Sequence, residues 1–206
     1  MVQVEERYYD IGGLSAGRLN GELLRKGPIR EGRTVHAVTD WSLRWSYVAR
    51  RAGPGCVSAS PSVELDVVTT LPRWTDLDTA PGHLVRDWRL YLRRLRAHEG
   101  GHRELAVAAS SELLERLGRL SARDCDTLLE DARRLAGRVV ARYDDRHAAF
   151  DRATAFGVRP VAEADEADEV AGAGEVATGG GDVSPGGAPS ASPGLLPRAG
   201  PPGRRR

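Results

Sequence analysis

The chain has 206 residues, 29% of them charged, and a formal net charge of +1. This length can bury one ordinary hydrophobic core, and the balanced charge excludes a general attraction to nucleic acid or to an anionic membrane. No stretch reaches the ~18 consecutive apolar residues of a membrane span. The opening residues, MVQVEERYYDIGG, lack the basic and apolar regions of a signal peptide. The sequence as written therefore predicts either a cytoplasmic protein or one shown without its leader.

The first part of the chain is predicted to form a sheet. YYDIGG (8–13) is typical of a short strand, and a short helix with Ser15 as its N-cap should follow and end at Gly27. A long half-buried strand is then predicted from an alternation with a period of two. Its inward residues are Val35, Ala37, Thr39, Trp41, Leu43, Trp45 and Tyr47. After the turn RRAGPGC, residues 62–70 alternate again, which favours an antiparallel sheet with one solvent-facing side.

The second part is predicted to be helical. From about Gly82 to Leu120, apolar residues recur at spacings of three and four, as in an amphipathic helix. Ser121 should open a second helix, with Asp124 completing its cap. Strands followed by helices predict a single α+β domain, which we place at residues 1–157.

A change in composition near Gly157 predicts a tail over residues 158–206. This segment holds 10 of the 24 glycines and 7 of the 12 prolines, and it contains no aromatic residue. Such a Gly/Pro/Ala-rich segment cannot bury enough apolar surface to offset the entropy lost on ordering its backbone. We therefore expect the tail to be disordered.

The helix of the second part contains the stretch HEGGH at residues 98–102. Its apolar stripe, continued through the motif, places His98 and His102 on the buried side, one turn apart, so that both imidazoles can reach one ion. Glu99 lies about 100 degrees round the helix, close enough to act on a water at that ion. Two imidazoles, a nearby carboxylate and an open position are what a zinc hydrolase requires. Two core histidines satisfied by hydrogen bonds are the alternative.

Gly100 and Gly101 lie inside this predicted helix, where two glycines together cost roughly 1–2 kcal/mol relative to alanines. One explanation is the close approach of another backbone or of a substrate strand. The other is tight packing against a neighbouring helix. Both explanations remain open at the level of the sequence.

A set of residues spread over most of positions 8–157 carries a family resemblance. These residues are Tyr8, Gly12, Gly27, Pro28, Thr39, Trp41, Trp45, Tyr47, Cys56, Leu71, Pro72, Trp74, Trp88, Tyr91, the HEGGH motif and Cys125. Their order and spacing resemble the bacterial domain-of-unknown-function family 922, predicted secreted zinc-dependent proteases. The resemblance implies a zincin-like fold, with a small antiparallel sheet packed on a long HExxH helix and a C-terminal helix. It further implies Zn²⁺ held by His98 and His102, Glu99 as general base, a peptide or protein substrate outside the cytoplasm, and a Cys56–Cys125 disulfide.

The chain departs from the family pattern at one position, because Phe156 stands where the family has a histidine. If that histidine is the third zinc ligand, His147 or Asp151 could replace it, since they lie one turn apart on one face of the last predicted helix. The alternative is a catalytically decayed relative, a zinc-binding or zinc-free binding domain.

Two further residues have candidate roles. Tyr143 could donate a hydrogen bond to an oxyanion, although packing is the commoner role of a helix tyrosine. His36 should lie with Asp40 and Arg44 on the polar face of the long strand. There it would line a substrate groove if that strand is at the edge of the sheet.

Overall fold

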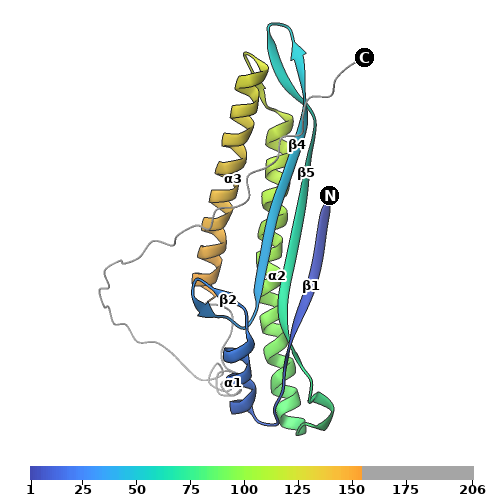
Figure 1. The fold of residues 1–206 in the computed structure, drawn as a ribbon, viewed down its shortest axis with the longest axis vertical. Coiled ribbons are helices and arrows are strands. Elements are labelled where there is room, and N and C mark those ends of the chain that lie inside the picture. The colour runs from blue at the N-terminus through green and yellow to red at the C-terminus, as the bar shows by residue number, and fades with distance from the viewer. Residues whose placement is uncertain (155–206) are drawn as a thin grey trace, which may run out of the picture.

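The computed structural model describes residues 1–154, which combine three helices with one main sheet (Figure 1). The mixed α+β class predicted from the sequence is confirmed. No helix among the described residues is long and apolar enough to span a membrane. Phe156 and the predicted tail, 158–206, lie outside the described residues.

The sheet is built around β5 (Gly55–Trp74), which has β4 (Val38–Ala52) on one side and β1 (Val2–Ile11) on the other. β4 and β5 form the predicted antiparallel hairpin. The prediction of a purely antiparallel sheet is wrong, because β1 runs parallel to β5, with Val2 opposite Leu65 and Ile11 opposite Trp74. The chain reaches β4 from β1 only after the helix α1 (Ala16–Lys26) and a small hairpin. This long crossover is what permits the parallel pairing.

One face of the sheet is covered by the helices and the other faces solvent (Figure 1). The predicted alternation holds along β4 and β5, since Thr39, Trp45 and Leu65 point inward and are buried. α2 (Gly82–Gly118) lies along this inner face, and α3 (Cys125–Ala153) lies beside α2. The short hairpin of β2 (Ile29–Arg30) and β3 (Arg33–Thr34) precedes β4, and the 3₁₀ helix η1 (Leu77–Thr79) precedes α2.

His36 does not lie on the polar face of the long strand, as predicted, because β4 begins only at Val38. The histidine is half-buried, and its Nδ1 is 2.8 Å from the hydroxyl of Tyr91. Its backbone carbonyl accepts a hydrogen bond from the hydroxyl of Tyr9 at 2.7 Å. These contacts draw His36 into the core at the start of β4.

The starts of α1 and α3 are set by capping side chains, whereas α2 begins after Pro81 without one. Ser15 caps α1 as predicted, since its hydroxyl accepts a hydrogen bond from the backbone N–H of Arg18. The last helix begins later than predicted. Ser121 belongs to the short strand β6 (Ser121–Ala122), which pairs with the start of β5, and Asp124 is the N-cap, accepting from the N–H of Thr127 at 2.7 Å. Because the chain pairs with β5 first, it cannot turn into a helix at Ser121.

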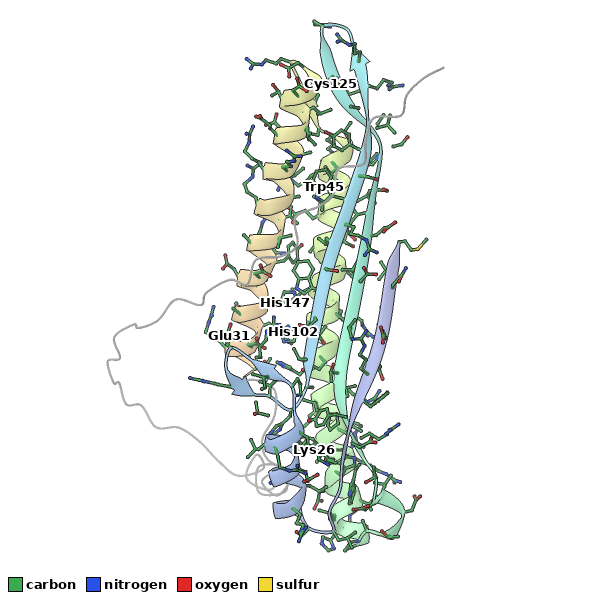
Figure 2. All side chains as sticks on the ribbon, viewed as in Figure 1. Lys26, Glu31, Trp45, His102, Cys125 and His147 are labelled. Atoms are coloured by element: carbon green, nitrogen blue, oxygen red, sulfur yellow. A yellow bond between two sulfur atoms is a disulfide. The ribbon has the colours of Figure 1, made fainter. Side chains whose placement is uncertain are left out.

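A disulfide joins Cys56 at the start of β5 to Cys125 at the start of α3, with the two Cα atoms 5.1 Å apart. The pairing that the family resemblance implied is therefore present. It closes the end of the molecule where the β4–β5 turn and the first turn of α3 meet (Figure 2).

The core is divided along α2. Near the start of α2, Trp74, Trp88 and Tyr91 pack into one cluster with residues of β1 and α1. Near its end, Trp45, Leu113 and Val139 belong to a second cluster between the sheet and α3. The HEGGH segment lies between these two clusters, so its side chains point into the same interior as the apolar residues on either side.

Candidate metal centre

Three ligand-type atoms converge between α2 and the last turns of α3. The Nε2 atoms of His98 and His102 are 3.2 Å apart. Asp151 Oδ1 is 3.2 Å from the first and 2.9 Å from the second. This is the group of histidine, cysteine and acidic side chains among the described residues whose ligand atoms gather closely enough to hold a metal ion. His98 and His102 meet here because their spacing of four residues stacks them on one helix face.

Thr154 orients His98 from the end of α3. Its hydroxyl donates to the backbone carbonyl of Phe150 at 2.8 Å and is 3.1 Å from His98 Nδ1. Because the hydroxyl hydrogen is used toward Phe150, the threonine oxygen is left to accept, which assigns the proton of His98 to Nδ1. The Nε2 lone pair of His98 then faces Asp151 and His102. Such a gathering of acceptors is stable only if a cation or protons lie between them.

His147 lies behind His102 rather than in the centre (Figure 2). The Nδ1 atoms of the two rings are 2.8 Å apart, and the indole of Trp41 stacks on the His147 ring. Burial lowers the pKa of His147 to about 4, which keeps the imidazole neutral, so that its Nδ1 can accept a hydrogen bond from the Nδ1–H of His102. Of the two residues predicted as alternatives for the third ligand, Asp151 reaches the centre, and His147 supports one of its histidines.

Asp151 is electrostatically adapted to this position. Burial acts to raise the pKa of its carboxyl. When the two histidine rings carry protons toward Asp151 in place of a cation, their hydrogen bonds and positive charges outweigh burial and hold the pKa well below its usual range. The carboxylate is therefore ionised at neutral pH and available as a ligand.

Glu99 lies one residue beyond His98 and points toward the sheet. It is only 5% exposed, and its Oε2 accepts a hydrogen bond from the Thr39 hydroxyl at 2.6 Å. The Thr39 hydroxyl is also 3.1 Å from that of Thr69 on β5. Burial raises the pKa of Glu99, against the opposing effects of the Thr39 hydrogen bond and the neighbouring histidines. The Thr39 hydroxyl thus holds Oε2 of Glu99 against the sheet.

The two glycines of the motif have different surroundings. A Cβ on Gly101 would lie 2.4 Å from the Phe150 ring, whereas a Cβ on Gly100 would meet no atom within 4 Å. The Phe150 ring in turn stacks on His98 and meets His102 edge-on, with centroid separations of 5.0 and 5.1 Å. Tight helix packing therefore explains Gly101, and it brings α3 close enough for Asp151 to reach the centre.

Tyr143 does not join the centre. It is buried in the apolar cluster near the end of α2, and the Arg146 guanidinium lies 4.5 Å from its ring centroid. Packing, the commoner of its two predicted roles, describes what it does.

Thr39 and Phe150 received no role at the site in the sequence analysis. The sequence did contain a signal for Thr39, because it is the one small polar residue in an otherwise aliphatic and aromatic row on the inward face of the long strand. Phe150 carried no comparable signal, since its importance depends on how α3 is rotated against α2.

The comparison with known families extends over the whole region just described. A family model with the description "Bacterial protein of unknown function (DUF922)" matches residues 6–157, which include the second half of β1 and all of β4, β5, α2 and α3. No curated protein and no solved structure matches the chain. The family description names no activity, so any function has to be argued from the residues themselves. With its fold and its candidate centre inside the matched region, the chain belongs to the bacterial family DUF922.

Proposed function

We propose that this domain is a zinc-dependent metallopeptidase that hydrolyses peptide bonds with water, with His98, His102 and Asp151 as zinc ligands and Glu99 as general base. The observation that carries the proposal is the convergence of two imidazole Nε2 atoms and one carboxylate oxygen beside a second, buried carboxylate. Buried acidic groups and facing acceptor atoms are costly to a fold unless hydrogen bonds, protons or a bound cation compensate them, and a gathering of such groups favours a functional site.

The residues present fit a zinc ion. Zinc bonds of about 2.0–2.2 Å in a tetrahedral site separate the ligand atoms by roughly 3.3 Å. The three separations here are 2.9, 3.2 and 3.2 Å. Two imidazoles and one carboxylate are also a common donor set of catalytic zinc sites, in which a fourth position stays open.

The chain's own groups divide the remaining work. When bound, zinc supplies Lewis acidity that polarises a carbonyl and acidifies water. Glu99 Oε2 is held by Thr39, so Oε1 is the atom that takes a proton from the attacking water and passes it to the leaving nitrogen. Thr154 contacts the Nδ1 atom of His98, and His147 contacts the Nδ1 atom of His102. Both histidine rings are thereby oriented with Nε2 toward the position that the ion would take.

A peptide substrate is supported by the position of β4. β4 pairs with β5 on one side, and no strand among the described residues pairs with its other side. Thr39 and Trp41 connect this strand to Glu99 and His147. An extended peptide that added to the free edge would gain main-chain hydrogen bonds and pass next to the centre.

The proposal is tested by metal content and peptide hydrolysis together. The full chain, purified without chelator, should hold one zinc and cleave a fluorogenic peptide library. Glu99→Gln should keep the zinc and lose about 10²–10⁴-fold in rate. His98→Ala and Asp151→Ala should lose the zinc, and His147→Ala should weaken zinc binding by about 10–100-fold. Asp145→Ala, which changes an exposed acid on the same helix, is the matched control.

Other outcomes identify the alternatives. A parent chain that takes up no zinc when zinc is offered refutes the proposal. If the parent chain binds zinc and yet shows no peptide hydrolysis that depends on Glu99, it is a binding domain that has lost catalysis. Cleavage of cell-wall peptides but not of protein peptides would retain the mechanism and change the substrate class.

A further inference from the structure

The outer edge of β1 is an open strand edge. β1 pairs with β5 along its whole length from Val2 to Ile11, and no strand among the described residues flanks its other side (Figure 1). β4, the strand at the opposite side of the sheet, has an irregularity between Ser46 and Val48, but the β1 ladder continues without one. Bulges protect the strand edge next to them from pairing with another chain. The irregularity of β4 lies beyond the Thr39–Trp41 segment beside the metal centre, and β1 has none along its length.

The inward face of β1 carries apolar side chains on both sides of Glu6 and is only partly covered. Val2, Val4 and Tyr8 are 49%, 50% and 45% exposed, although their neighbours on β5 are buried. The helix α2 lies over β5 and reaches β1 through Arg96, which contacts the Tyr8 hydroxyl at 3.1 Å and the Glu6 carboxylate at 3.4 Å. The strand therefore presents both unpaired backbone groups and apolar side chains.

The charges on β1 are self-complementary. On the outward face, Glu5 and Arg7 form an ion pair within the strand at 2.7 Å. If a second β1 runs antiparallel with Glu6 opposite Glu6, each Glu5 faces an Arg7 of the second copy. The four side chains then form a square in which every nearest neighbour has the opposite charge. Cross-strand pairs of this kind stabilise antiparallel strands.

The inward face is compatible with the same register. Val4 lies opposite Tyr8 of the second copy, which makes an apolar cross-strand pair on each side of the centre. The two central Glu6 carboxylates are each paired with their own Arg96. This register also places the two Glu6 carboxylates opposite each other, where the Arg96 side chains offset their repulsion. Shifting the register by one pair in either direction would place Glu5 opposite Glu5 or Arg7 opposite Arg7 and would lose both cross-strand Glu5–Arg7 pairs.

From these features we infer that β1 is a homodimerisation surface, where two copies of this chain join their sheets edge to edge in the antiparallel register centred on Glu6. The interface is separate from the candidate metal centre, because β1 and β4 lie on opposite sides of β5. The dimer therefore leaves the free edge of β4 and the centre beside it accessible.

Charge-reversal variants of the full chain test this inference, with the dimer dissociation constant measured by sedimentation over a wide concentration range. The parent should form a dimer. Arg7→Glu and Glu5→Arg should each weaken it at least tenfold, and the double variant Glu5→Arg with Arg7→Glu should restore it. Arg44→Glu is the matched control, because Arg44 is also an exposed arginine on a strand, here β4, and forms an ion pair with Glu64 of β5. It should leave the dimer constant unchanged.

Hydrogen exchange gives a second readout. In the dimer, amides on the outer edge of β1 should become protected as the concentration rises, while amides of β4 should not. A chain that is monomeric at every concentration, or a dimer that both single reversals leave intact, overturns the inference. Zinc content and peptide hydrolysis are measured separately, so failure of the dimer and failure of the proposed enzyme are distinguishable.

Discussion

Two stretches of α2 are both buried, but one buries apolar side chains and the other buries ionisable side chains. Near its end, Leu113 and Leu117 are fully buried among the apolar side chains of the sheet and α3. A few turns earlier, Glu99 and His102 are 5% and 8% exposed, beneath the same sheet and beside the same helix. Depth of burial is thus shared, and only the kind of side chain differs.

The apolar stretch is expected to stabilise the fold, and the stretch with ionisable side chains is not. Burial of apolar side chains contributes roughly 1.5–3 kcal/mol for each large residue, whereas buried ionisable groups contribute little or oppose folding. A protein that keeps such groups inside usually does so for function. Substitutions in the two stretches should therefore separate stability from chemistry.

The largest effect is expected in the apolar stretch. Leu113→Ala should lower the free energy of unfolding by about 2–5 kcal/mol, because it leaves a cavity between α2, α3 and the sheet. Glu99→Gln should change that free energy by less than about 1 kcal/mol, since the amide keeps the shape and can still accept from Thr39. Denaturant unfolding measures both, and an equal loss in the two variants would contradict the contrast.

An intermediate effect is expected at the glycines of the motif. Gly101→Ala forces its new methyl group against the Phe150 ring and should cost about 1–3 kcal/mol. Because Phe150 precedes Asp151, the displaced helix should also bind metal more weakly. Gly100→Ala is the matched control: its methyl group meets no atom, so it should stabilise the helix by about 0.5–1 kcal/mol. Thermal unfolding measures the stability of the two variants, and metal titration measures their affinity. Equal stability and equal metal affinity in Gly101→Ala and Gly100→Ala would show the prediction to be wrong.

The smallest effect concerns pH. Burial lowers the pKa of His36, so the folded state keeps the imidazole neutral at pH values where the unfolded chain already binds a proton. Stability should therefore fall as the pH drops below about 6.5, the pKa of an unperturbed histidine, toward the lowered pKa of the folded state. His36→Gln should reduce this slope, whereas His83→Gln, at an exposed position, should not. The measurement is the free energy of unfolding at a series of pH values, and identical slopes for both variants would refute it.

Much of the fold could be predicted because its strongest patterns are local. The period of two between Val35 and Tyr47 predicted which side of the long strand is buried, including Thr39 and Trp45. The spacing of four placed His98 and His102 side by side on one helix face, as they lie in the structure. These features depend only on the geometry of a single element.

The parts that failed depend on contacts between elements. The parallel pairing of β1 was missed because Glu5, Glu6 and Arg7 interrupt any alternation in an edge strand that is exposed on both faces. Nor could the sequence choose between His147 and Asp151, since both lie on one face of α3. The choice is made by the rotation of that helix, which is set by Phe150 against Gly101.

The parallel pairing of β1 also has a consequence for the order of folding. β1 is made before β4 and β5, and its partner residues on β5 lie roughly 60 positions later in the chain. At synthesis rates of about 5–20 residues per second, β1 waits several seconds before β5 leaves the ribosome. The local β4–β5 hairpin and α2 can form without it, because contacts close in sequence form fastest. Of the strands that the structure describes, the one that comes earliest in the chain is therefore expected to be the last to join the sheet.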